Sequence, residues 1–300
     1  MPLIARRRLL CSTAAAGSLF LASMKADAAF TGDIQLRGQI GRLERLPTRT
    51  LESLEDFRTS LRDFVNTDFQ RAAIRRTRTI FREAGLDPRE EVSMEEVVSI
   101  LESDPIIMNQ THAWITSQLA MWRDLQDYFH SEADRYLSEM AAADISGPGS
   151  LELNPGMSIP QYAAWEIHNQ PGGYVGDPFA GHMYHYGTNN LYIHSNDQDG
   201  RHAAIAAAAP VPEDNSVKRC LDLGCSVGQS AIGLKERFSE AEVWGIDVGA
   251  PMVRYAHMRA ADLGIDVNFA QRLAEDTKFP DNHFDIINAQ LRFNMGNHNS

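Results

Sequence analysis

The sequence predicts an α/β protein in which a mostly helical N-terminal region precedes a domain built on a parallel β-sheet. Between residues 51 and 140, apolar side chains recur at intervals of three and four, the spacing of one face of a helix. From residue 217 onward, short apolar runs alternate with a glycine turn and helical segments, which is typical of β-α-β units. The chain therefore divides into a helical part and a sheet-forming part.

Composition and charge exclude several classes of protein. The 300 residues include 28 basic and 40 acidic side chains, giving a formal net charge of −12. We expect no nucleic-acid partner, because binding to phosphates needs a basic face. Three cysteines cannot build a disulfide scaffold. Outside the N-terminus, no stretch of about 20 residues is apolar enough to span a bilayer.

The first 28 residues have the pattern of an export signal. The basic run 6–8 precedes an apolar segment and an Ala-x-Ala sequence that ends at Ala28. The Arg-Arg-x-Leu-Leu run also resembles a twin-arginine signal, which exports folded proteins. We expect cleavage after Ala28 and a periplasmic protein without a stable membrane span. An uncleaved helical anchor and a mis-assigned start codon are the alternatives.

Residues 29–145 are predicted to form a helical domain. The segment 51–84 should be helical, and Gly85 should end it. We expect one buried face on this helix, made by Leu54, Phe57, Leu61, Phe64 and Val65.

Two more helices should follow in the same domain. Ser93 and Glu96 have the spacing of a capping box, so a helix should begin there and end at Pro105. Apolar spacing from His112 to Met140 predicts a longer helix.

Residues 146–215 form a third segment, rich in glycine, histidine and tyrosine. No helical or strand period is visible around His182, Tyr184 and His185, so this part is predicted to be loop-rich. It could be a structural cover for the next domain or part of a substrate pocket. We expect no metal site, because no carboxylate or cysteine completes a ligand set around the histidines. An alanine-rich helix, 203–209, should lead into the final segment.

The chemistry is indicated by residues 216–300. A buried strand (217–223) precedes a glycine turn (224–230) and a helix, an arrangement that brings backbone amides close to a ligand. Asp247 ends the second strand (242–247), where its carboxylate suits the two hydroxyls of a ribose. The Gly224-x-x-x-Gly228 spacing departs from the dinucleotide pattern, and Asp222 suits a ligand with a positive amino group. Further strands are predicted at 266–270 and 284–289.

These residues resemble a known family. The run 221–228 resembles motif I of class I S-adenosylmethionine-dependent methyltransferases, 245–252 resembles the motif that follows it, and 274–287 resembles the motif II region of the type 11 group. That group is similar to ubiquinone and menaquinone biosynthesis methyltransferases. The resemblance, over about residues 216–290, implies a Rossmann-like methyltransferase core and S-adenosylmethionine as cofactor.

The resemblance also implies roles for individual residues in cofactor binding. It assigns such roles to Asp222, Gly224, Ser226, Gly228, Asp247, Val248, Met252, Ala274 and Glu275. The first four would hold the methionine part, Asp247 the ribose, and Val248 with Met252 the adenine. The Ala274 amide would face the adenine edge. Leu273 stands where the family often has an acid, so that contact is absent or made by Glu275.

The expected function is methyl transfer to a small-molecule acceptor. No catalytic base is assigned; His182, Tyr184 and His185 are the candidates. Only the first four of the family's seven strands, ordered 3-2-1-4-5-7-6, can be placed before residue 300. We therefore expect an incomplete domain whose fourth strand is an exposed edge open to self-association. A truncated or decayed relative that binds the cofactor without turnover is the alternative function, and an NAD-dependent enzyme is a third. Because the cofactor is made in the cytoplasm, a cytoplasmic location competes with the export signal.

Overall fold

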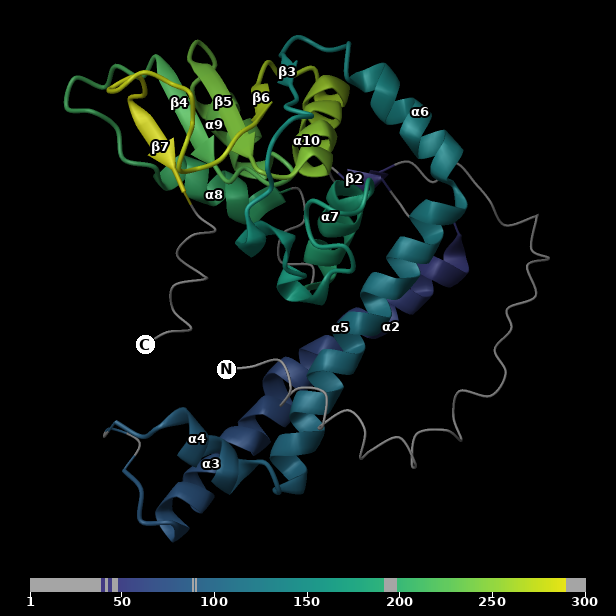
Figure 1. Ribbon diagram of the computed structural model, residues 1–300, viewed down its shortest axis with the longest axis vertical. Coiled ribbons are helices and arrows are strands. Elements are labelled where there is room, and N and C mark those ends of the chain that lie inside the picture. Colours follow the sequence, from purple (N-terminus) through teal and green to yellow (C-terminus); the bar gives the residue numbers. More distant parts are fainter. Residues whose placement is uncertain are drawn as a thin grey trace.

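The computed structural model describes residues 39–40, 43–44, 48–87, 89, 91–191 and 199–289. The predicted export signal lies outside these residues. Figure 1 shows a sheet domain, with helices packed on it, from which a group of long helices extends as an arm. No helix in the described ranges combines the length and apolar character needed to cross a membrane.

The arm is built from the helical region that the sequence predicts. Two short strands, β1 (Gln39–Ile40) and β2 (Leu43–Glu44), precede it. Helix α2 (Arg49–Phe64) continues through a π-helical turn, η1 (Val65–Phe69), into α3 (Gln70–Glu83). Then come α4 (Met94–Leu101), α5 (Pro105–Ser131) and α6 (Ala133–Ala143). Helix α5 lies alongside α2 and α3 (Figure 1).

The predicted buried face of the first helix is largely wrong. Phe57 and Phe64 are 63% and 50% exposed, whereas Thr59, Arg62 and Val65 are buried. In the described part of the chain, α5 and α7 both contact α2, but Phe57 and Phe64 are not among the residues that become buried. Apolar spacing predicted the helix correctly but not which of its sides would be covered.

Pro105 begins a helix rather than ending one. Its predecessor Asp104 is the N-cap of α5, and its Oδ1 accepts hydrogen bonds from the amides of Ile106 (3.0 Å) and Ile107 (3.3 Å). Proline suits this first helical position because the missing N–H would have no partner there. The predicted capping box is confirmed, since Ser93 Oγ accepts from the Glu96 amide at 3.2 Å. The predicted helix 112–140 is divided at Glu132.

The histidine- and tyrosine-rich segment is partly helical, contrary to prediction. It contains β3 (Leu151–Glu152), two 3-10 turns, η2 (Gln161–Ala164) and η3 (Ile167–Asn169), and helix α7 (Ala180–Leu191). Every side chain from Ala180 to His185 is buried. A helix covered on all sides has no amphipathic period, which is why sequence reading missed α7. The predicted alanine-rich helix is present as α8 (Gly200–Ala208).

The four predicted strands of the final segment are present as β4 (Arg219–Leu223), β5 (Glu242–Asp247), β6 (Asn268–Gln271) and β7 (Ile286–Asn288). All are parallel, in the order β3-β6-β5-β4-β7. Without β3, this is the expected order 3-2-1-4. The segment 146–215 contributes β3, which pairs Leu151 with Phe269 at the edge of the sheet.

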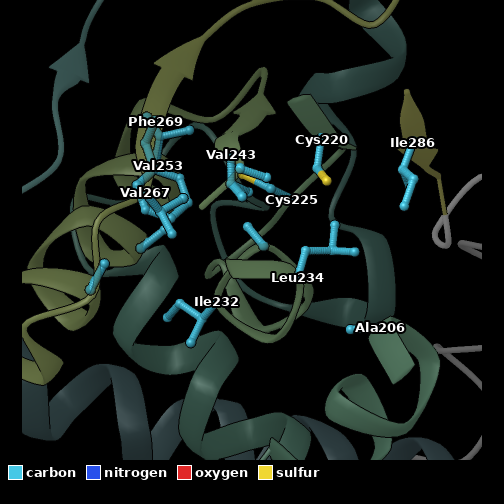
Figure 2. Close-up of a cluster of buried hydrophobic side chains, with 14 residues drawn as sticks. Ala206, Cys220, Cys225, Ile232, Leu234, Val243, Val253, Val267, Phe269 and Ile286 are labelled. Carbon is cyan, nitrogen blue, oxygen red and sulfur yellow. The ribbon is translucent and has the colours of Figure 1, made fainter. Parts of the chain in front are cut away.

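The sheet has a separate core on each face. Helices α9 (Gln229–Arg237) and α10 (Ala250–Leu263) cover one face, where Val243, Val253 and Phe269 are fully buried, as Figure 2 shows. On the other face, Leu221 and Ile246 pack under the loop that follows β6. Successive strand residues thus point to opposite cores, which makes these strands nearly continuous apolar runs.

Strand β7 is an edge of the described sheet. It pairs with β4 alone among the described strands, and Ile287 is 60% exposed. Self-association through this edge stays a prediction.

Phe269 should be the side chain whose loss most weakens the sheet domain. Its ring fills the space left by two glycines, since a Cβ on Gly228 or Gly245 would approach it to 2.8 Å. We expect Phe269→Ala to lower the free energy of unfolding by about 3–5 kcal/mol. Urea denaturation measures this; Ile287→Ala, an exposed control, should cost about 0.5 kcal/mol or less. Equal losses in the two variants would contradict the packing described here.

Candidate functional site

The candidate site lies where β4 and β5 end, at the turn that leads into α9. The amides of Gly224 and Cys225 both donate to the Ile246 carbonyl, at 2.8 and 2.9 Å. These bonds hold the turn against the end of β5. Helix α9 begins immediately afterwards, so the amides of its first turn face the same edge of the sheet.

The turn needs glycine where the backbone is left-handed and crowded. Gly228 has φ +76°, and a Cβ there would lie 2.8 Å from the Phe269 ring and 3.0 Å from Ala256 Cβ. Gly224 also has φ +77°. Ser226 adopts φ +52° despite its side chain, and its buried Oγ has no hydrogen-bond partner within the described ranges. A close approach of backbone to a ligand fits this geometry.

Asp222 is a buried carboxyl at the carboxyl end of β4. Its side chain is 3% exposed, and Oδ1 accepts from Asn288 Nδ2 at 2.7 Å. The nearby Ala231 amide favours the charged form, yet Oδ2 has no hydrogen bond of normal geometry to any described residue. Burial raises the pKa of Asp222 to about 7, and the negative Asp247 adds to this rise. The site therefore contains an acceptor oxygen that lacks a donor.

Asp247 ends β5 beside the turn. Its Oδ2 accepts from the Ser226 amide (3.0 Å) and its Oδ1 from the Gly249 amide (2.9 Å). Burial raises the pKa of this carboxyl, while the same amides lower it. Each oxygen keeps a second lone pair, so both can still accept from a hydroxyl. The structure thus brings Asp222, Asp247 and the glycine turn together.

The residues predicted to contact adenine lie at the start of α10. Val248 is half-buried, and its carbonyl accepts from Gln271 Nε2 at 3.1 Å. Met252 is fully buried in a cluster with Val227 and the aromatic rings of Tyr184 and Tyr174. The cover of Met252 therefore comes from the histidine- and tyrosine-rich segment.

Ala274 and Glu275 form a turn after β6, closed by a bridge between Leu273 and Asp276. The Glu275 carboxylate accepts from the Tyr162 hydroxyl at 3.0 and 3.1 Å. The Arg272 amide, just before this pair, donates to the Asp247 carbonyl at 3.0 Å. The turn therefore begins beside the end of β5.

Sequence reading missed two groups of site residues. Asn288 lies opposite Asp222 in the register of β4 and β7, so the strand order could have identified it. The buried pair of Asp199 and Arg259, at 2.6 Å, also supports the turn, since Arg259 Nη1 donates to the Val227 carbonyl at 2.9 Å. No sequence motif announces that pair.

Of the three candidate bases, Tyr184 packs in the cluster that contains Val227 of the glycine turn and Met252. His182, Tyr184 and His185 lie on α7, which packs against α10. Burial lowers the pKa of His182 to about 3 and that of His185 well below its usual range. The described residues contain no group of three or more histidine, cysteine or acidic side chains able to hold a metal ion.

Comparisons with known proteins identify the family of this segment. Residues 220–299 match the model of the methyltransferase domain family. The match supports a class I S-adenosylmethionine-dependent methyltransferase domain in these residues. S-adenosylmethionine is the cofactor of that family. The match begins within β4 and includes the glycine turn.

Individual relatives share this methyltransferase domain over part of their length. The demethylmenaquinone methyltransferase of Thermus thermophilus is 38% identical over 27% of this chain and 36% of its own length. That of Deinococcus radiodurans is 31% identical over 32% of this chain and 39% of its own length. Phosphoethanolamine N-methyltransferase 1 of Arabidopsis thaliana is 34% identical over 23% of this chain and 14% of its own. The chain thus spans little more than a third of the length of the demethylmenaquinone methyltransferases.

A solved structure of geranyl diphosphate methyltransferase, in complex with GPP and sinefungin, aligns with 47% of this chain over 45% of the geranyl diphosphate methyltransferase chain. The sequence identity is 18% and the TM-score is 0.25.

The residues of the methyltransferase domain fit its cofactor. The unpartnered Oδ2 of Asp222 can accept from the amino group of S-adenosylmethionine, and the two oxygens of Asp247 can accept from ribose hydroxyls. The crowded left-handed Gly228 keeps the turn free of a side chain. The roles of the nine assigned residues stay predictions.

Cofactor affinity should rise with pH through about 7. Only the ionised carboxylate of Asp222 attracts a positive amino group, and burial places the pKa of this group at about 7. We expect the dissociation constant of S-adenosylmethionine to fall about tenfold between pH 6 and pH 8. Calorimetric titration across this range measures it.

Asp222→Asn is the matched variant. It should bind more weakly and lose most of the pH dependence. The pKa of Asp222 is higher in the folded chain than in the unfolded chain, so the neutral carboxyl stabilises the folded state at low pH. This stabilisation is lost as the pH rises through about 7, where the buried carboxyl ionises. The variant should therefore melt higher than wild type at pH 8, whereas an unchanged pH profile would contradict the role of Asp222.

Proposed function

We propose that the protein transfers a methyl group from S-adenosylmethionine to a small-molecule acceptor. The observation that supports this most is the pair of carboxyls, Asp222 and Asp247, at the ends of adjacent strands on either side of a crowded glycine turn. One carboxyl suits an amine and the other suits a diol, the groups that lie on either side of the sulfonium in this cofactor.

The side chains would act mainly by positioning. When bound, the cofactor supplies an electrophilic methyl group. Asp222 would hold the amino group in a buried setting where a charge-assisted hydrogen bond is strong, and Asp247 would orient the ribose. Fixing the cofactor on both sides of its sulfonium restricts the direction from which an acceptor atom can approach the methyl group.

The relatives suggest the class of acceptor. Their names refer to demethylmenaquinone and phosphoethanolamine, both small molecules. The net charge of −12 also disfavours a polyanionic acceptor such as a nucleic acid. A small molecule is therefore the acceptor class we propose.

Asp247→Ala should abolish most cofactor binding. Loss of hydrogen bonds to a charged group costs about 1.5–3 kcal/mol each, so we expect affinity to fall at least about tenfold in calorimetric titration. Glu240→Ala, an exposed acid on the loop before β5, is the control and should bind as wild type does. No heat with wild type, or equal heat with Asp247→Ala, would overturn the cofactor assignment.

Turnover separates an enzyme from a relative that only binds the cofactor. We expect the full chain to release S-adenosylhomocysteine, detected by mass spectrometry, when S-adenosylmethionine is mixed with a metabolite extract or with reduced demethylmenaquinone. Product should disappear in Asp247→Ala. Cofactor binding by wild type without product in either mixture would favour the binding-only alternative.

A further inference from the structure

Helix α3 concentrates positive charge at the far end of the arm. Its 14 residues include five arginines and one acid, although the net charge of the whole chain is −12. Four of these arginines recur at intervals of four, three and four residues, which places them within about 60° of one another around the helix. The resulting arginine row is about 16 Å long. It consists of four exposed side chains: Arg71, Arg75, Arg78 and Arg82.

The arginine row faces away from the rest of the arm. Helix α3 packs on α5, and Ala73, the one buried residue of α3, lies on the side of the helix opposite the row. Figure 1 shows α3 and α4 at the end of the arm that is remote from the sheet. The row is therefore open to a partner that approaches the end of the arm from outside.

Most of the row lacks the acidic partners that a solvent-exposed arginine can find within its own chain. Arg76, on another side of α3, pairs with Asp104 at 2.6 Å, and Arg71, the first residue of the row, pairs with Asp68 at 3.3 Å. Among the residues that the structure describes, no acid forms an ion pair with the other three members, Arg75, Arg78 and Arg82. Like charges four residues apart destabilise a helix, so an anionic partner would stabilise this one.

Exposed apolar side chains accompany the arginine row. Ile74, which is 43% exposed, lies three residues after Arg71 and four before Arg78, so it borders the row on the helix surface. On α4, which packs on α3, Met94 and Val98 are 69% and 47% exposed. Helices that lie on an anionic membrane combine basic and apolar side chains in this way, because the charges attract the headgroups and the apolar groups enter the interface.

We propose that the end of the arm binds the surface of an anionic lipid bilayer through the arginine row and Ile74. A straight row of cations can meet a flat layer of phosphates with all its members at once. A nucleic acid also offers phosphates, but it has no hydrocarbon layer to take up Ile74, Met94 and Val98, so these side chains favour the bilayer. This inference does not rest on the proposed methyl transfer, because its site and its test need no cofactor.

Sedimentation of the full chain with sucrose-loaded vesicles tests the arginine row. One set of vesicles is equimolar phosphatidylglycerol and phosphatidylcholine, and the other is phosphatidylcholine alone. We expect stronger binding to the anionic set. Replacing both Arg75 and Arg78 by glutamine should weaken that binding about 25-fold, since each cation near an anionic surface contributes about fivefold.

The matched control replaces Arg135 and Lys278 by glutamine. Both are exposed, and both lie outside α3, on α6 and on the loop after β6. The control has the same net charge as the double variant of α3 but should bind vesicles as wild type does. The basic run 6–8 can also attract anionic lipid, so the comparison of the two variants decides the role of the row. Equal binding by the two variants would overturn the proposal.

Ile74→Ser tests the apolar contact at constant charge. It should weaken binding to the anionic vesicles about three- to tenfold, because a side chain that enters the interface is lost. Unchanged binding would show that apolar insertion is not involved and would contradict the assignment to a bilayer. Binding of a single-stranded oligonucleotide without vesicle binding would assign the row to nucleic acid instead. All variants should bind S-adenosylmethionine as wild type does, so this proposal and the cofactor assignment fail independently.

Discussion

The site depends on one carbonyl. Ile246 O, near the end of β5, accepts the amides of both Gly224 and Cys225, and this pairing fixes where the chain leaves β4 and turns into α9. The left-handed backbone at Gly224 and Gly228 lets the turn close, and Phe269 fills the space beneath Gly228. With the turn held there, Asp247 reaches the Ser226 amide from the next strand. Backbone amides therefore hold the Asp247 carboxyl, and the Asn288 side chain holds that of Asp222.

The burial of the Asp222 carboxyl lowers the stability of the folded chain. A carboxyl at 3% exposure with one unpartnered oxygen destabilises the folded chain when it is ionised, and its pKa of about 7 reflects this cost. Asn288 offsets part of the cost by donating to the other oxygen. Unpaired buried groups of this kind often lie at functional sites. The supporting pair of Asp199 and Arg259, in contrast, satisfies its charges internally.

Sequence reading predicted the sheet better than the helices. Strands β4 to β7 were found because each reads as a short apolar run, and the resemblance supplied their order. It failed at α7, whose side chains from Ala180 to His185 are all buried and show no period. It also failed at Phe57, because apolar spacing does not reveal which side another helix will cover. In the site, Asp222 and Asp247 follow from local motifs. Asp199 and Arg259 are 60 residues apart, and only the fold brings them together.

The edge strand β3 has a consequence for the order in which the protein is made. Ser150 and Leu151 pair with residues of β6 that follow 118 residues later in the chain. At synthesis rates of about 5–20 residues per second, this strand leaves the ribosome roughly 6–24 s before its partner. Until then its backbone has no sheet to join, and the helical arm is the part that can fold first. The sheet therefore closes late, through a contact between distant parts of the chain, which is the kind of step that slows folding.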